Sequence, residues 1–214
     1  MIRILLVDDH ALFRSGMRSI LESEPDFEVV GEAESGEEAV DLTHRLSPQV
    51  VLMDVHMPGI GGIEATRRVL RIDAEIRVIA LTVLDDEPFP TRLLDAGARG
   101  YLTKGCPAEE LVKAIHHVIM DKHYLSADVA QKISLSNIVH KGESSPLSRL
   151  SPREMQVMMM ITQGNTNQEI SDALFLSPKT VSTYRTRLFE KLDLHNDVEL
   201  THFALRHGLI ELSQ

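Results

Sequence analysis

Apolar and polar positions follow two different periods along the first half of the chain. Segments rich in aliphatic and β-branched residues recur at 2–7, 27–33, 49–54, 76–82 and 98–104. Between them, apolar residues recur with the helical period, as at Leu12, Met17, Ile20 and Leu21. Strands that alternate with amphipathic helices predict a parallel sheet with helices on both faces. We therefore expect a doubly wound, five-stranded α/β domain over residues 1–121.

The pattern changes after residue 121. A short helical segment at 126–133 precedes a Ser-rich stretch without periodicity, which is typical of a linker, and we place that linker at 122–147. Beyond it, a capping residue followed by Pro or Glu predicts helix starts at Ser151, Thr166, Ser177 and Asn196. Since strand patterns are absent there, residues 148–214 are expected to form a small all-α domain.

Composition narrows the class of protein. Hydrophobic residues at 43% and charged residues at 25% are typical of globular domains and exclude wholesale disorder. The single cysteine cannot form an internal disulfide, and no Cys or His pairs have zinc-finger spacing. The apolar stretch at 4–7 is too short for a signal peptide or a membrane span. We expect a cytoplasmic protein with no membrane partner.

Charge is distributed unevenly. The net charge of −10 counts against nucleic acid as a partner, because phosphate contacts need cations. However, residues 1–123 hold 22 acidic and 13 basic side chains, whereas residues 148–214 hold 8 and 7. The segment 177–191 contains one acidic residue, Glu190, and four basic ones: Lys179, Arg185, Arg187 and Lys191. The overall acidity therefore hides a local basic face.

Polar residues stand at the carboxyl ends of the predicted strands. Asp8 and Asp9 follow the first, Asp54 ends the third, Thr82 the fourth and Lys104 the fifth. These ends share one edge of a parallel sheet, which is where ligands bind. Clustered carboxylates need a cation, and oxygen ligands without His or Cys select Mg²⁺. A phosphoryl-transfer site follows, and because no GxxxxGK[ST] loop is present, the phosphoryl group comes from outside the chain.

Asp54 is the preferred nucleophile. The Pro- and Gly-rich segment 56–62 follows it, which exposes the strand end and can offer the backbone carbonyl of His56 as a metal ligand. Asp8 and Asp9 would hold the metal, and Lys104 would neutralise phosphoryl oxygens while an acyl phosphate forms on Asp54.

The motifs LVDDH (6–10), VVLMDVHMPGIGG (50–62), ALT (80–82) and GYLTK (100–104) resemble the receiver domain of bacterial two-component response regulators, which has a flavodoxin-like fold. This resemblance implies that a sensor histidine kinase phosphorylates Asp54 and that Asp8 and Asp9 bind Mg²⁺. It also implies that Thr82 and Lys104 sense the phosphoryl group. Tyr101 matches the aromatic switch position of the family, whereas Gly105 departs from it, since many relatives have Pro after the lysine.

The basic segment 177–192 has the pattern of an amphipathic helix. Val181, Leu188 and Leu192 share one face, and small hydroxylated and cationic residues share the other. A preceding helix at 167–174 completes a helix-turn-helix, whose second helix is slim enough for the major groove of DNA.

Residues 148–214 resemble the LuxR-type DNA-binding domain. By that resemblance, base edges would be contacted by Lys179, Ser182, Thr183 and Thr186. Many relatives have Lys at position 182. The full set implied to contact double-stranded DNA is Lys179, Thr180, Ser182, Thr183, Tyr184, Arg185, Thr186, Arg187 and Lys191.

Together the two halves resemble response regulators of the NarL/FixJ class, and within it the GacA/UvrY/SirA/LetA group. That likeness implies a tripartite hybrid sensor kinase as phosphodonor, activation of small regulatory RNA genes, and a homodimer on DNA that pairs through 196–207. It does not imply an enzyme, beyond the assistance that a receiver gives to its own phosphorylation and dephosphorylation. Two alternatives stay open: a Mg²⁺-dependent phosphatase that forms an aspartyl phosphate, and a regulator that binds DNA independently of phosphorylation.

Overall fold

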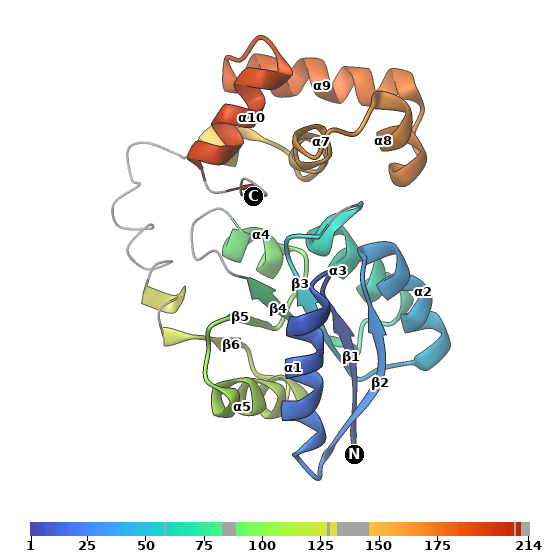
Figure 1. The fold of residues 1–214 in the computed structure, drawn as a ribbon, viewed down its shortest axis with the longest axis vertical. Helices are drawn as coiled ribbons and strands as arrows, with labels where there is room; N and C mark the ends of the chain where they lie inside the picture. The colour runs from blue at the N-terminus through green and yellow to red at the C-terminus, as the bar shows by residue number, and fades with distance from the viewer. Residues whose placement is uncertain (58, 83–88, 128, 132–145, 208, 211–214) are drawn as a thin grey trace. The chain divides into compact units, whose positions relative to one another are not determined.

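The computed structural model describes residues 1–57, 59–82, 89–127, 129–131, 146–207 and 209–210 (Figure 1). The chain divides into two compact units, Met1–Ser136 and Asn137–Gln214. Most of the linker expected at 122–147 and part of the helical segment expected at 126–133 lie outside the described residues. In the described part of the chain, no helix combines the length and the apolar character needed to cross a membrane.

The first unit is a parallel sheet with helices on both faces, as predicted (Figure 1). Its strands are β1 (Ile2–Val7), β2 (Phe27–Ala33), β3 (Val50–Asp54), β4 (Arg77–Thr82), β5 (Gly100–Thr103) and β6 (Tyr124–Leu125). Its helices are α1 (Ala11–Glu22), α2 (Gly36–Leu46), α3 (Gly61–Ile72), α4 (Phe89–Asp95) and α5 (Ala108–Ile119). The strand order is β2-β1-β3-β4-β5-β6, and every neighbouring pair is parallel.

A sixth strand corrects the expectation of five, counted over the described residues. Tyr124 and Leu125 pair in parallel with Gly100 and Tyr101 at the edge of the sheet. Two residues are too few to show a strand period, so the sequence pattern could not reveal β6. The start of the segment expected as linker therefore belongs to the sheet.

The sheet separates two apolar layers. On one face, Met17 and Leu21 of α1 and Leu111 and Ile115 of α5 form a buried cluster with alternate strand residues such as Ile4. On the other face α2 packs against α3, and α3 contacts α4 (Figure 1). Strands buried on both faces explain why their sequences are continuously apolar.

Helix α1 departs from the predicted apolar stripe. Met17 and Leu21 are buried as expected, but Leu12 is 88% exposed, and Arg14 is buried instead. The Arg14 guanidinium donates to the backbone carbonyl of Asp8 and pairs with the carboxylates of Glu32 and Glu34. Burial of a charged group requires such partners, which helical periodicity does not register.

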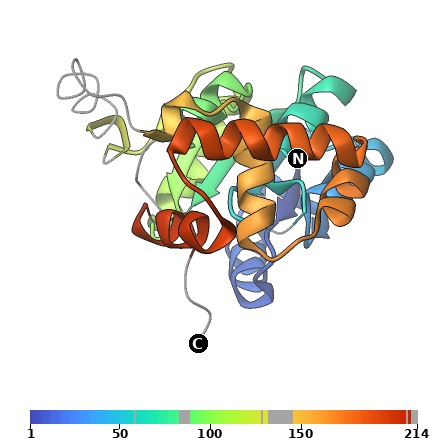
Figure 2. The same cartoon turned by 90° about the horizontal axis from the view of Figure 1, so that it is seen from above.

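In the described part of the second unit, every regular element is helical. The elements are η1 (Pro146–Arg149), α7 (Pro152–Thr162), α8 (Asn167–Leu174), α9 (Pro178–Leu192) and α10 (Asp197–Arg206). Figure 2 shows α9 as a long helix, and it packs on both α7 and α8. The all-α prediction is confirmed.

All four predicted helix starts are confirmed by their hydrogen bonds. Ser151 and Thr166 each form a capping box with the glutamate three residues later. The Ser177 hydroxyl accepts from the backbone N–H of Thr180, and the Asn196 carboxamide accepts from that of Glu199. Each cap satisfies a backbone donor that the helix leaves unpaired.

Candidate functional site

Strand register places two buried carboxylates side by side. Val7 of β1 lies opposite Met53 of β3, so Asp8 and Asp54 follow at the same edge of the sheet. Asp8 is 0% exposed and Asp54 is 1% exposed. Two carboxylates removed from water repel each other strongly unless a positive charge lies close by.

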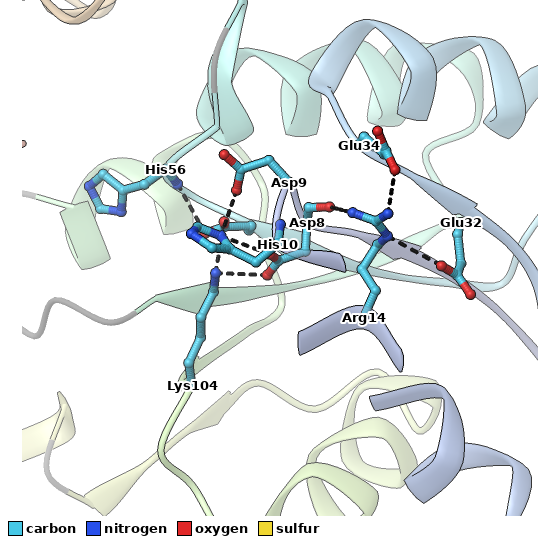
Figure 3. Close-up of polar contacts among 9 residues, drawn as sticks. Asp8, Asp9, His10, Arg14, Glu32, Glu34, His56 and Lys104 are labelled. Atoms are coloured by element: carbon cyan, nitrogen blue, oxygen red, sulfur yellow. Dashed lines mark hydrogen bonds and ion pairs between the residues drawn. The ribbon is translucent and has the colours of Figure 1, made fainter. Parts of the chain in front are cut away.

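Lys104 supplies that charge. Its Nζ lies 2.7 Å from Oδ2 of Asp8 (Figure 3) and 2.8 Å from Oδ2 of Asp54. The backbone N–H of Lys104 donates to the carbonyl of Thr82, which holds the β5 end against β4. The ammonium also lies 4.9 Å from the centre of the Phe13 ring. The structure therefore brings together the lysine and two of the three carboxylates singled out from the sequence.

The electrostatics of this cluster are dominated by burial. Burial raises the pKa of Asp54 to about 6, although the Lys104 ammonium acts in the opposite direction. Burial alone would lower the pKa of Lys104, but the carboxylates of Asp54 and Asp8 together raise it. The lysine therefore stays charged at neutral pH, whereas Asp54 is protonated more easily than an exposed aspartate.

Asp9 and His10 complete the cluster. Ligand atoms of Asp8, Asp9, His10 and Asp54 all lie within 4.8 Å of one another. The His10 Nδ1 is 2.8 Å from Oδ1 of Asp9 and 3.3 Å from Oδ1 of Asp8 (Figure 3). Three carboxylates suit a hard divalent cation such as Mg²⁺. Sequence reasoning missed His10, although it directly follows the acidic pair.

The loop after β3 is held close to Asp54. The backbone N–H of His56 donates to Oδ1 of Asp54 at 3.0 Å. Burial, followed by the charge of Lys104, lowers the pKa of the His56 imidazole to about 4, so this ring is neutral at pH 7. A Cβ at Gly62 would lie 2.0 Å from the backbone oxygen of Asp54, so only glycine allows this approach of α3. Pro58 of the same loop lies outside the described residues.

A second network, which the sequence did not indicate, supports the loop of Asp8. Arg14 donates to the backbone carbonyl of Asp8 and pairs with Glu32 and Glu34 (Figure 3). Arg18 pairs with the same Glu32, which lowers the pKa of that carboxylate. These contacts anchor the β1 end from the side opposite Lys104.

Thr82 and Tyr101 are both fully buried, at 0% exposure. Thr82 is the last residue of β4 and lies opposite Thr103 of β5, which directly precedes Lys104. Tyr101 is among the largest fully buried side chains and pairs in register with Ala80. The structure thus places Thr82 at the same sheet edge as the carboxylates and Tyr101 inside the core.

The predicted faces of α9 are confirmed. Val181, Leu188 and Leu192 are buried against the domain. The exposed residues among those expected to contact DNA are Lys179, Ser182, Thr183, Thr186, Arg187 and Lys191, while Thr180, Tyr184 and Arg185 are half-buried.

Two of the cations on α9 make contacts within the domain. Arg185 pairs with Asp197 of α10, lies 3.5 Å from the Asn167 carboxamide oxygen and covers the Phe189 ring. Lys191 pairs at 2.6 Å with Glu154. Glu154 is 2% exposed and also caps α7. Helical periodicity alone did not indicate either ion pair.

Comparison with protein families gives two matches. Residues 4–116 match the family described as "Response regulator receiver domain", and residues 148–204 match "Bacterial regulatory proteins, luxR family". The two matched segments contain the carboxylate cluster and α9, respectively.

Similar proteins span almost the whole chain. Response regulator UvrY of Escherichia coli K12 is 51% identical over 209 residues, which cover 98% of this chain and 96% of that protein. Response regulator GacA of Pseudomonas viridiflava is 50% identical over 213 residues, which cover 100% of both.

Solved structures are also similar. RcsB of Salmonella enterica serovar Typhimurium, bound to the promoter rprA in the presence of the phosphomimetic BeF3-, has a TM-score of 0.73 and 25% identity, and the match covers 94% of this chain and 97% of that chain. Response regulator ChrA of a heme-sensing two-component system has a TM-score of 0.55 and 33% identity, and the match covers 98% of each chain.

Proposed function

This chain belongs to the two-component response regulators that carry a LuxR-type DNA-binding domain, and from that membership we propose that it is a transcription regulator switched by phosphorylation of Asp54. The phosphoryl group comes from a sensor histidine kinase. The observation that carries the proposal is the Lys104 ammonium, which lies within 2.8 Å of both Asp54 and Asp8 at one edge of the sheet.

Asp54 acts as the nucleophile. One of its carboxylate oxygens attacks the phosphorus of the kinase phosphohistidine, the P–N bond breaks, and the histidine nitrogen keeps the electron pair. The product is an acyl phosphate on Asp54. Because Lys104 already contacts Asp54, its ammonium neutralises the oxygens of the incoming phosphoryl group without a large movement.

Mg²⁺ fits the donor set at this edge. We infer that Asp8, Asp9, Asp54 and the backbone carbonyl of His56 hold it, since hard oxygen donors are what this cation prefers. When bound, it supplies positive charge that offsets the carboxylates and the phosphoryl oxygens.

The signal leaves the site through Thr82 and Tyr101. We infer that the Thr82 hydroxyl, together with Lys104, senses the phosphoryl group, since Thr82 lies at the same sheet edge. Tyr101 is packed in the core on the neighbouring strand, and it acts as the switch residue that repacks when Thr82 moves.

The output is sequence-specific binding of double-stranded DNA through α9. The exposure of Lys179, Ser182, Thr183, Thr186 and Arg187 supports this role. RcsB, which was solved on promoter DNA, adds support by its similarity over 94% of this chain. We further propose a homodimer on DNA that pairs through residues 196–207, with the segment that follows β6, up to residue 147, linking the two domains. By likeness to the GacA/UvrY group, the donor is a tripartite hybrid kinase and the targets are small regulatory RNA genes.

The test is incubation of the full chain with a small phosphodonor and Mg²⁺, followed by mass spectrometry and DNA binding. We expect incorporation of one phosphoryl group per chain at Asp54, none in Asp54→Asn, and a change in operator affinity in the wild type alone. Removal of Mg²⁺ with EDTA should abolish labelling.

Two other outcomes would overturn the proposal. Sustained release of phosphate from external phosphomonoesters over many turnovers would indicate a Mg²⁺-dependent phosphatase. Identical operator affinity and transcription in Asp54→Asn and the wild type would indicate a regulator that works independently of phosphorylation.

A further inference from the structure

Three hydroxyl groups occupy the middle of the exposed face of α9. They belong to Ser182, Thr183 and Thr186, and each donates its proton to the backbone carbonyl four residues earlier. The distances from hydroxyl oxygen to carbonyl oxygen are 3.0 Å from Ser182 to Pro178, 3.0 Å from Thr183 to Lys179 and 3.1 Å from Thr186 to Ser182. Hydrogen bonds of this kind are local to the helix and do not require DNA.

These bonds determine what the hydroxyls can offer to a ligand. A hydroxyl has one proton and two lone pairs, so a proton donated to the helix leaves only acceptor capacity. Ser182 Oγ also accepts from the Asn167 carboxamide at 3.3 Å, which uses one of its lone pairs. Thr183 and Thr186 therefore present oxygen acceptors and methyl groups to solvent, with no hydrogen-bond donor.

The major groove distinguishes bases by such groups. Adenine and cytosine present amino donors there, and thymine presents a methyl group, whereas guanine presents only the acceptors N7 and O6. As long as its proton stays bonded to the helix, such an oxygen can accept from an amino group but offers no donor to guanine. Next to this stretch, the exposed cations Lys179 and Arg187 can donate to guanine or to phosphate.

We propose that the middle of α9 selects major-groove methyl and amino groups, that is thymine, adenine and cytosine, against the acceptor edge of guanine, and that Thr183 and Thr186 carry this selectivity. The inference rests on DNA binding by α9, as proposed above. Lys179 and Thr186 are separated by about 10 Å along the helix at 1.5 Å per residue. At 3.4 Å per base step, this length spans about three base pairs.

The first step of the test is selection of a binding site from random DNA duplexes with the full chain phosphorylated by a small phosphodonor. Single atoms of the selected site are then changed: thymine to uracil removes a methyl group, adenine to purine removes an amino group, and guanine to 7-deazaguanine removes N7. In the middle three base pairs of a half-site, uracil should weaken binding about fourfold, the value for one buried methyl group. Purine should weaken it by at least as much, and 7-deazaguanine should have no effect.

A matched pair of variants assigns the effect to side chains. Thr183→Ser keeps the hydroxyl and loses the methyl group, while Thr183→Val keeps the shape and loses the hydroxyl. We expect Thr183→Ser to bind thymine and uracil sites equally, and Thr183→Val to lose the penalty for purine but retain that for uracil. The same pair at Thr186 should act on a different base pair, and circular dichroism checks that each variant remains folded.

The outcomes separate this inference from the function on which it rests. If the phosphorylated chain enriches no sequence, the proposed DNA-binding function fails. If a sequence is enriched but its central pairs depend on guanine N7, or if both serine variants keep the full uracil penalty, the function stands and the selectivity proposal is overturned.

Discussion

The carboxylate cluster of the first unit and the exposed face of α9 are built in opposite ways. Asp8, Asp54 and Lys104 are far apart in sequence, and only the register of parallel strands brings their buried charges together. The residues on the exposed face of α9 are neighbours on one helix, and their side chains are open to solvent. A site of the first kind depends on tertiary structure for both its geometry and its charge state, whereas a site of the second kind needs only a helix that is held in place. Substitutions should therefore cost far more stability in the cluster than on α9.

The largest loss of stability is expected from Lys104→Met. This change leaves the carboxylates of Asp8 and Asp54 buried together without the ammonium. The Lys104 side chain is only 10% exposed, so water cannot easily take its place. Removing one partner of a buried ion pair costs about 3 kcal/mol or more. Urea unfolding in EDTA measures it. Adding Asp54→Asn should recover much of the loss, because it removes the like charge, and an equal loss in the single and double variants would contradict the electrostatic explanation.

A second large effect is expected from Gly62→Ala. The new Cβ would lie 2.0 Å from the backbone oxygen of Asp54, so α3 must move away from the phosphoacceptor. Overpacking of this kind costs about 1–3 kcal/mol. Hydrogen exchange should increase in β3 and α3 and remain unchanged in α9.

Gly16→Ala is the matched control for that change. Gly16 lies within α1, and a Cβ there would meet nothing within 4 Å. Alanine should therefore raise the free energy of unfolding by about 0.5–1 kcal/mol, which is its advantage over glycine inside a helix. If both glycine variants behave alike, the close approach at Gly62 is not what requires glycine.

Lys191→Ala tests the part of α9 that resembles the buried cluster. Burial alone would raise the pKa of Glu154, but Lys191 and the cap at Ser151 together lower it. A lowered carboxyl pKa stabilises the fold above the unfolded-state value, and this contribution disappears as pH falls through the folded-state pKa. Because the Lys191 side chain is 38% exposed, we expect a loss of about 1 kcal/mol at pH 7.

The loss in Lys191→Ala should shrink as the pH falls below 4.5, the ordinary pKa of a glutamate, and thermal melts at pH 7 and at a pH below 4.5 measure it. Lys179→Ala provides the control on the exposed side of the same helix. It should leave the melting temperature unchanged at both pH values. A loss in Lys191→Ala that does not depend on pH would show that packing, rather than the ion pair with Glu154, is responsible.

The same contrast explains which features could be predicted from the sequence. Strand ends and helix caps depend on local patterns, and so Asp54, Lys104 and the four caps of the second unit could be placed in advance. Arg14, Arg185 and Lys191 could not, because their burial or pairing depends on a carboxylate that another element supplies. Strand β6 was missed for a different reason, since two residues carry no period.

Arg187→Ala should have the smallest effect on stability and should instead change the salt dependence of DNA binding. Arg187 is exposed on α9, whereas Arg185, two residues earlier, is paired with Asp197. Loss of one phosphate contact lowers the slope of log K against log salt by about one. Arg187→Ala should therefore weaken binding to all sequences with this change of slope and leave urea unfolding unchanged. Arg185→Ala should lower the free energy of unfolding, because it leaves Asp197 without its cation. If the slope instead changes only in Arg185→Ala, the pair with Asp197 opens on DNA, and Arg185 is the phosphate contact.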